Sequence, residues 1–231
     1  MYRNGTLGVT VILRDGKVIR ETINQTLYAY WNDIRAGRLA PKRFEVEPSQ
    51  IAALLPDTFI LERIDSETSR FRLAGTRICE AFGAEFRGVN MLDLLTDEDR
   101  VTMQRQISVI SRQGAVGVFT FISQNPAGQA VKWEMLILPL VHLHNDVDRY
   151  LGAVAIVDEP AWLRHEPLDK HRMLANTLIW PDGRPHAMID ASHRQAPFLP
   201  HMREARIVRA DRRHFRVYDG GLANTTDEEH R

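Results

Sequence analysis

The stretch between residues 115 and 158 constrains the fold of this chain most, because three consecutive segments in it carry β-strand patterns. The segments read AVGVFTFIS, AVKWEMLILPLV and RYLGAVAIVD, and the connections NPAG and HND between them are turn-like. In the middle segment, Trp133, Met135 and Ile137 share one face, and Lys132 and Glu134 share the other. The stretch therefore predicts three consecutive strands of a sheet.

Two shorter strand patterns precede this region. DTFILERID and RFRLA alternate around the polar turn SETS, which predicts a hairpin. Helical patterns follow in TRICEAFG, which ends at Gly83, and in NMLDLL. Thr96 and Asp99 then have capping-box spacing and open a longer helix that ends at Gly114. This element order predicts an α+β fold, with a five-stranded antiparallel sheet and helices packed on one face.

An amphipathic helix is predicted over residues 25–37, ahead of these strands, and a short helix between Pro48 and Pro56 follows it. The apolar stripe of the first helix consists of Leu27, Tyr30, Trp31 and Ile34. The stripe has two interpretations that do not exclude each other. It can cover the sheet, or it can pair with its own copy as the interface of a homodimer.

The rest of the chain predicts extensions rather than further domains. Residues 1–24 read either as a hairpin around Asp15-Gly16 or as a loosely ordered tail. Residues 25–160 form the predicted domain with its flanking helix. Residues 161–231 have weak periodicity and predict a C-terminal arm packed on the domain, with a short strand pair around 205–218.

Composition excludes several classes of function. Lys plus Arg and Asp plus Glu both number 30, so nothing global favours nucleic acid or a membrane surface. The single cysteine, Cys79, excludes a disulfide framework and a thiolate zinc site within one chain. No apolar run approaches the roughly 20 residues of a membrane-spanning helix, and the N-terminus has no signal-peptide pattern. We therefore expect a cytoplasmic protein.

The order of the elements and the segment FRLAGTRICEAFGAEFRGVNMLDLLTDEDR, residues 71–100, together resemble the PAS family. A PAS domain has here a strand, a small-residue turn, a helix ending in glycine, an acidic residue, a glycine, an apolar turn and an acidic helix start. The matching positions are Phe71–Leu73, Gly75, Gly83, Glu85, Gly88, Leu92–Leu95 and Asp97–Asp99. The chain also resembles short single-PAS proteins of alphaproteobacteria. The resemblance implies the fold but no particular ligand.

The resemblance disfavours two cofactors. Light-sensing PAS domains that form a flavin–cysteine adduct carry a reactive cysteine where this chain has Met91, and a thioether cannot form that adduct. Cys79 lies on the preceding helix and reads as a small buried apolar residue. Haem-binding PAS domains need an axial histidine, usually on the long helix, and residues 97–113 contain none. No cofactor is therefore identifiable from the sequence.

A ligand pocket between the sheet and the helices is the main candidate site. Its predicted lining is Met91, Met103, Ile107, Phe119, Phe121, Trp133 and Met135. The alternative is that these side chains close into a core without a ligand.

Histidines supply weaker candidates. His142 and His144 could share a strand face and bind a metal, but no third ligand lies nearby, so no metal site is predicted. HEPLDKH at 165–171 is similar to the phosphoacceptor helix of a histidine kinase. Pro167 would disrupt that helix and a Gly-rich phosphate loop is missing from the sequence, so kinase activity is not expected.

The basic stretch His201–Arg216 reads as a solvated arm, with docking to an acidic partner as the alternative. The arginines predicted for docking are Arg209, Arg212, Arg213 and Arg216. Arg209 and Arg213 have the spacing of a cyclic-dinucleotide-binding motif, but the D-x-S-x-x-G partner motif does not follow. Zero net charge argues against nucleic acid.

The sequence thus predicts a non-catalytic PAS sensory or docking protein of bacterial signal transduction. We expect it to act through protein contacts, as a homodimer or with a histidine kinase or another signalling protein. Binding of a small ligand in the pocket and a core without a ligand both stay open. A nucleic-acid-binding regulator and a small enzyme are the alternatives. The enzyme has the weaker case, because no nucleophile–base set or carboxylate pair is recognisable.

Overall fold

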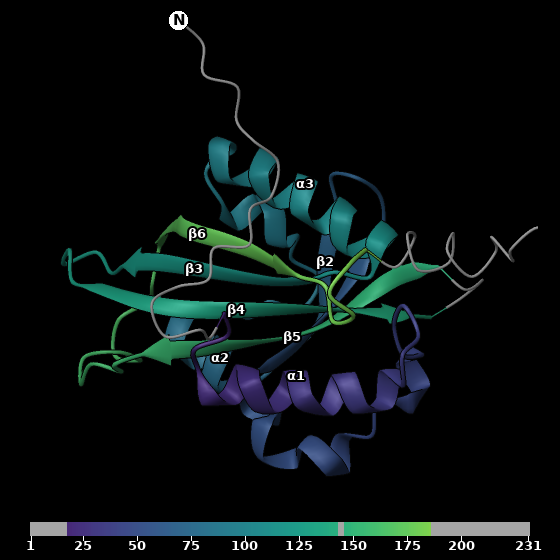
Figure 1. Cartoon of the computed structure of the whole chain (residues 1–231). Helices are drawn as coiled ribbons and strands as arrows, with labels where there is room; N and C mark the ends of the chain where they lie inside the picture. Colours follow the sequence, from purple (N-terminus) through teal and green to yellow (C-terminus); the bar gives the residue numbers. More distant parts are fainter. Residues whose placement is uncertain (1–17, 143–145, 186–231) are drawn as a thin grey trace, which may run out of the picture. The chain divides into compact units, whose positions relative to one another are not determined.

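The computed structural model describes residues 18–142 and 146–185 of the chain (Figure 1). The α-helices are α1 (Thr22–Arg35), α2 (Thr76–Phe82) and α3 (Asp97–Gln113), and the 3₁₀-helices are η1 (Arg43–Glu45), η2 (Pro48–Asp57) and η3 (Met91–Leu94). The strands are β1 (Thr58–Arg63), β2 (Ser69–Ala74), β3 (Val116–Gln124), β4 (Ala130–Val141), β5 (Val147–Val157) and β6 (Lys170–Ile179). The predicted α+β fold is confirmed.

The strands form one antiparallel sheet in the order β2-β1-β5-β4-β3-β6. This corrects the predicted number of five strands to six. The added strand, β6, pairs with β3 from Val116–Ile179 to Gln124–Lys170. Its residues are exposed or half-exposed, so they show little of the apolar alternation by which a strand is recognised. The prediction that 161–231 is only an arm is therefore wrong for the part that includes β6.

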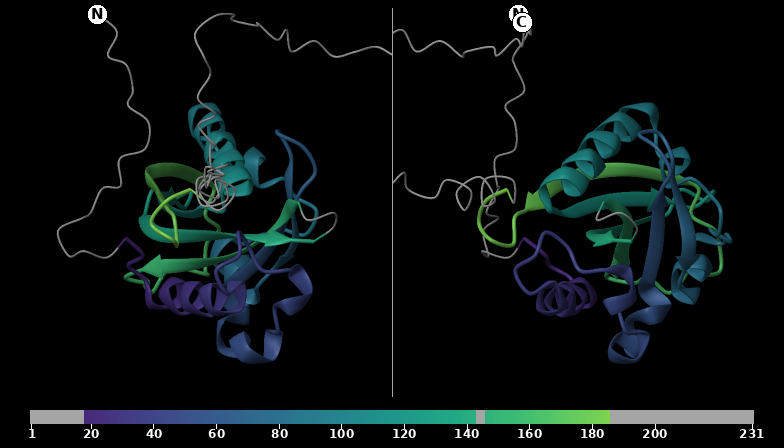
Figure 2. Two further views of the ribbon diagram at one scale, coloured as in Figure 1. Left: turned by 45° about the vertical axis from the view of Figure 1, so that its right-hand side comes forward. Right: turned by 90° about the vertical axis from the view of Figure 1, so that its right-hand side faces the viewer.

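The two faces of the sheet carry different helices. Trp133 on β4 packs edge-on against Phe82 of α2, on what we call the cavity face. The next residue, Glu134, accepts a hydrogen bond from Asn24 of α1, on what we call the α1 face. Figure 2 shows α1 and α3 on opposite sides of the sheet. The prediction of helices on one face thus holds for α2 and α3 but not for α1, whose apolar stripe needs burial as much as theirs.

Local signals explain where the helices begin and end. At the start of α3, Thr96 Oγ1 accepts a hydrogen bond from the Asp99 N–H at 3.3 Å, as the capping spacing predicts. The helices α2 and α3 end at Gly83 and Gly114, whose φ values of 64° and 65° suit glycine. Helix α1 begins at Thr22, so the domain includes part of the segment predicted as an extension over residues 1–24.

Several predictions lie outside the described residues. They are the hairpin around Asp15-Gly16, the strand pair at 205–218, and the docking arginines Arg209, Arg212, Arg213 and Arg216. Among the residues that are described, no helix combines the length and the apolar character needed to cross a membrane.

Candidate functional site

A small cavity, which we call the inner cavity, lies between the cavity face of the sheet and the helices α2 and η3. It is lined by Phe59, Phe71, Ile78, Phe82, Phe86, Met91, Leu94, Leu95, Trp133, Met135, Val154 and His171. Its volume is about 40 Å³. Small-molecule sites usually occupy about 300–1,000 Å³, whereas one water takes about 30 Å³ in the liquid. The cavity as it stands therefore has room for little more than a water molecule.

Aromatic rings fill the space that a larger ligand would need. Phe121 stacks on Trp133 with ring centroids 4.3 Å apart and an interplanar angle of 12°. Phe82 stands edge-on to Trp133 at 5.2 Å and to Phe86 at 5.7 Å. Aromatic pairs of this kind contribute about 0.5–1.5 kcal/mol each beyond the area that they bury. A larger ligand could enter only if these rings separated.

Three polar groups meet at the β6 end of the inner cavity. Trp133 Nε1 donates a hydrogen bond to Ser123 Oγ at 2.7 Å, and Ser123 Oγ lies 2.8 Å from His171 Nδ1. An indole N–H can only donate, so the serine oxygen accepts from Trp133 and its own hydrogen can point to Nδ1. Burial lowers the pKa of His171, although Asp169 acts in the opposite direction. The arrangement fits a neutral imidazole that carries its proton on Nε2.

The pairing of Ser123 with His171 does not have the geometry of a catalytic nucleophile and base. Ser123 has no exposed surface, and its oxygen already accepts the hydrogen bond from Trp133. A nucleophilic serine has to reach its substrate. Together with Trp133, the pair instead links the adjacent strands β3, β4 and β6 beside the cavity.

The inner cavity borders a surface groove. Leu94, Leu95 and His171 line both the cavity and a groove of about 580 Å³ beside β3 and the start of β6. These three side chains separate the interior from solvent.

The seven predicted lining residues are all buried. Met91, Trp133 and Met135 line the inner cavity. Met103, Ile107, Phe119 and Phe121 lie in the surrounding core instead. The sequence prediction missed Phe82, whose burial follows from its place on the amphipathic α2, and His171, which lies on the unrecognised strand β6.

Met91 and Cys79 occupy different surroundings. Met91 is 3% exposed and lines the inner cavity from η3. Cys79 is a half-buried free thiol on α2 and does not belong to the cavity lining. The prediction that this chain lacks the flavin–cysteine adduct rests on the Met91 thioether, and among the described residues no thiol lines the inner cavity.

The apolar stripe of α1 lies mostly inside the chain. Leu27 and Trp31 have no exposed surface, and Trp31 Nε1 donates a hydrogen bond to the Pro139 carbonyl oxygen at 2.9 Å. Both positions are packed on the α1 face of the sheet, which is the first of the two interpretations of the stripe, and the dimer contact stays a prediction. Tyr30 and Ile34 are half-buried, and Tyr30 Oη accepts a hydrogen bond from the Glu47 N–H at 2.7 Å.

Glu134 anchors the start of α1 to β4. Its carboxylate accepts hydrogen bonds from the backbone N–H groups of Arg20 and Glu21, at 3.1 and 3.2 Å, and from the Asn24 amide at 2.9 Å. Glu134 is only 3% exposed. A buried carboxylate with these partners satisfies N–H groups that a helix start leaves free.

The C-terminal end of α1 is held by the segment that follows β6. Arg35 donates two hydrogen bonds to the Asp182 carboxylate, from Nη1 at 2.8 Å and from Nη2 at 2.9 Å. Arg35 is 4% exposed, and its guanidinium lies 5.7 Å from the centre of the Trp31 ring. Bidentate pairs of this kind combine strength with a fixed orientation.

The described residues hold no cluster of three or more His, Cys, Asp or Glu side chains placed to bind a metal ion. His142 lies 3.7 Å from Asp148 Oδ2 at the end of β4, and His144 lies outside the described residues.

A family model described as a PAS domain matches residues 19–155. Among solved structures, the LOV protein of Rhodobacter sphaeroides is 12% identical, with 50% of this chain and 71% of that chain covered and a TM-score of 0.38. The PAS domain of an HTR-like protein from Haloarcula marismortui is 20% identical, with 50% and 95% covered and a TM-score of 0.33. No curated protein matches the chain.

Proposed function

The chain belongs to the PAS domain family, a family of sensory domains, and on this premise we propose that it is a non-catalytic sensory or docking protein of bacterial signal transduction. In this proposal the protein works in the cytoplasm and passes its signal through contacts with another protein. The inner cavity receives the signal, and α1 transmits it.

One observation carries the proposal: consecutive residues of β4 serve both parts. Trp133 and Met135 line the inner cavity, and Glu134 between them anchors α1 on the opposite face. Because side chains alternate along a strand, a shift of the backbone on the cavity side also moves the Glu134 carboxylate. Hydrogen bonds depend steeply on geometry, so such a shift weakens the attachment of α1.

Helix α1 is suited to be the transmitting element because both of its ends are tied to other parts of the domain. Glu134 holds its start, and Asp182 holds its end through Arg35. In this proposal α1, which also packs on the sheet through Leu27 and Trp31, has a docked and a released arrangement, and a signal biases the balance between them. Release of α1 would uncover the apolar α1 face of the sheet for a partner.

The partner that we propose is a signalling protein such as a histidine kinase, rather than a second copy joined through the α1 stripe. Leu27 and Trp31 are unavailable to another chain while α1 is docked. A homodimer would have to form through a different surface. The proposal requires no flavin photochemistry, because Met91 at the cavity cannot form a thiol adduct.

Hydrogen exchange of the full chain tests the coupling between cavity and helix. Phe121→Ala removes the ring that stacks on Trp133, and Ile110→Ala is the control, because Ile110 is also fully buried but lies on α3. We expect Phe121→Ala to accelerate exchange in residues 20–35 more than Ile110→Ala does, with the two variants compared at equal free energy of unfolding. Local opening of this kind is separable from global unfolding.

The opposite outcome is an equal effect of both substitutions on α1. If residues 20–35 exchange at the same rate in both variants at matched stability, the cavity and α1 are not coupled. The proposed route through β4 would then be abandoned.

A further inference from the structure

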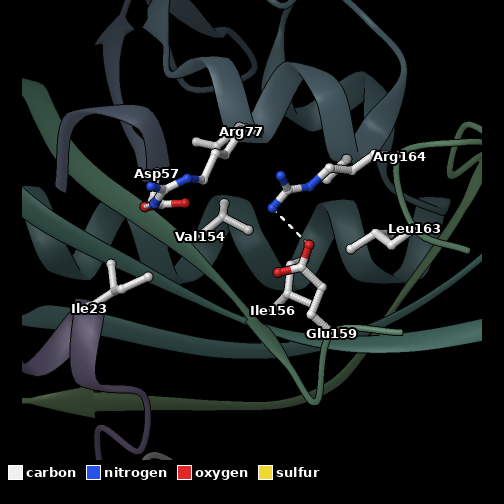
Figure 3. A pocket seen from close by; sticks show the side chains of 10 residues that line it. Ile23, Asp57, Arg77, Val154, Ile156, Glu159, Leu163 and Arg164 are labelled. Carbon is white, nitrogen blue, oxygen red and sulfur yellow. Dashed lines mark hydrogen bonds and ion pairs between the residues drawn. The ribbon is translucent and has the colours of Figure 1, made fainter. Parts of the chain in front are cut away.

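A second cavity, of about 160 Å³, lies where α1, α2 and the end of β5 meet (Figure 3). Four charged residues form what we call its rim: Asp57, Arg77, Glu159 and Arg164. Its apolar floor consists of Ile23, Ile78, Ala81, Val154, Ile156 and Leu163. The cavity adjoins the inner cavity, with which it shares Ile78 and Val154, but arginine and carboxylate side chains line only the second cavity of the two.

The rim consists of two ion pairs that come from different parts of the chain. Arg77 Nη1 on α2 lies 2.5 Å from Asp57 Oδ2, and Arg164 Nη2 lies 2.7 Å from Glu159 Oε1 in the segment after β5. In Figure 3 the two guanidinium groups lie on either side of Val154. Arg164 Nη1 also lies 3.7 Å from Glu80 Oε2 of α2, outside the lining of the cavity. A guanidinium carries five N–H donors, so each arginine keeps donors beyond those that these carboxylates engage.

The four groups also share one electrostatic environment. Burial raises the pKa of the Asp57 carboxyl. The positive charges of Arg77 and Arg164 act to lower that pKa, and the negative charge of Glu159 acts to raise it. The charges of the rim sum to zero, because two arginines face two carboxylates. An anion in the cavity would be repelled by both carboxylates, and a cation would be repelled by both arginines.

The segment that carries Arg164 is fixed rather than loose. Leu163 beside it is 4% exposed, and its N–H donates a hydrogen bond to the Pro160 carbonyl oxygen at 3.0 Å. Arg164 itself has a φ of 75°, which is uncommon for a residue other than glycine. Such a conformation persists only where its surroundings impose it, and here it directs the guanidinium across the cavity.

We propose that this cavity binds a small aliphatic α-amino acid in its zwitterionic form. The ligand carboxylate accepts hydrogen bonds from Arg77 and Arg164, and the ligand ammonium donates to Glu159 and Asp57. The aliphatic side chain lies on the floor of isoleucine, valine and leucine side chains. A zwitterion matches a rim that carries both signs of charge, and an aliphatic group matches the floor.

The size of the cavity agrees with this ligand. A cavity of about 150 Å³ accommodates benzene, so 160 Å³ suits an amino acid with a short branched side chain such as valine. The floor includes Ile23 of α1, so a bound ligand would touch the helix that we propose to transmit the signal. The use of the ligand as a signal rests on the proposed function, whereas its binding does not.

Isothermal titration calorimetry of the full chain tests the binding directly. The probes are L-valine, isobutyrate, which lacks the ammonium group, and isobutylamine, which lacks the carboxylate. We expect L-valine to bind at least about tenfold more tightly than either analogue, because each analogue carries only one charge, which two groups of the rim attract and the other two repel. No binding of L-valine, or equal binding of an analogue, would overturn the proposal.

Two variants and a matched control locate the site. Arg164→Gln and Glu159→Gln should each weaken L-valine binding about tenfold. Arg72→Gln is the control, because Arg72 is also an ion-paired arginine, bonded to Glu62 away from the cavity. In methyl NMR spectra the signals of Ile23 and Ile156 should shift on addition of L-valine. Equal weakening by the control, or shifts confined to other isoleucines, would overturn the proposed site.

Valine binding and the hydrogen-exchange test fail independently. Binding without any coupling between the inner cavity and α1 would leave the amino acid site in place and remove the proposed route of signalling. Coupling without valine binding would keep the proposed route of signalling and remove the amino acid site.

Discussion

Glu134 on β4 is a buried carboxylate that accepts hydrogen bonds from N–H groups at the start of α1. Its neighbours on the strand, Trp133 and Met135, point to the cavity face of the sheet. Glu134→Ala removes the acceptor for Arg20, Glu21 and Asn24. We expect it to lower the free energy of unfolding by about 1–3 kcal/mol, because donors left buried without a partner are costly. Lys132 lies on the same face but is exposed, so Lys132→Ala should change stability by less than about 0.5 kcal/mol.

Urea denaturation of both variants makes this comparison. A Glu134→Ala protein as stable as the Lys132→Ala protein would show that water replaces the carboxylate without cost. The anchoring of α1 would then depend on its apolar stripe alone.

His171 makes stability depend on pH. Burial lowers its pKa below the ordinary value of 6.5, so the unfolded chain binds a proton at a higher pH than the folded chain does. Stability contributed by the neutral ring is therefore present above about pH 6.5 and is lost as the pH falls below it. The slope from this residue is at most about 1.4 kcal/mol per pH unit.

The contribution of His171 is isolated by comparing wild type with His171→Gln across pH 5 to 8 in urea denaturation. The carboxyl groups that titrate in the same range are present in both proteins and cancel in the difference. We expect the difference in stability to shrink as the pH falls. A difference that is constant with pH would show that His171 has the same pKa in both states.

At the scale of elements, α1 shows how one stripe can be read in two ways. Trp31 is fully buried, donates to Pro139 and lies under the Arg35 guanidinium. Trp31→Glu should therefore detach α1 and destabilise the fold by several kcal/mol, because the new charge would lie in a desolvated contact. Asp33→Ala on the exposed side of the helix should leave stability within about 0.5 kcal/mol of wild type.

Circular dichroism and analytical ultracentrifugation of Trp31→Glu separate the two interpretations. A well-folded monomer with unchanged melting behaviour, from a wild type that is dimeric, would restore the dimer interface. An unfolded or aggregated variant agrees with the burial seen in the structure.

The elements that could be predicted are those whose pattern reflects burial on one side. The alternation in β4 placed Trp133 and Met135 correctly on the face that lines the inner cavity, and the cap at Thr96 placed the start of α3. Glu134 was placed on the right face, but its burial could not be predicted, because it depends on α1 folding over that face. The strand β6 was missed because an edge strand with exposed side chains has little apolar alternation.

The candidate site was predictable only in part for a related reason. Met91, Trp133 and Met135 come from elements that the sequence revealed, so their meeting followed from the fold. The volume of the inner cavity depends on how Phe82 and Phe121 pack against Trp133, which no pattern in one sequence encodes. The rim of the second cavity joins Asp57 to Arg164, and only the tertiary structure brings these residues together.

At the scale of the whole molecule, the family match ends near β5, at residue 155, whereas the sheet continues through β6. The segment between them contributes Leu163 and Leu168, both 4% exposed, to the core. Arg164 of this segment lines the second cavity, and His171 at the start of β6 lines the inner cavity. The folding unit should therefore extend beyond the segment that matches the family.

Two truncated chains test this extent. A chain of residues 1–185 keeps β6 and the Asp182 contact to Arg35, and it should unfold cooperatively in urea. A chain of residues 1–160 loses Leu163, Leu168 and β6 and leaves β3 as an unpaired edge. It should lose at least about 3 kcal/mol, since full burial of each leucine contributes about 1.5–3 kcal/mol. An exposed apolar edge also favours association, so aggregation of the shorter chain is expected on gel filtration. Equal midpoints for the two truncated chains would show that β6 adds nothing to stability and that the domain ends with β5.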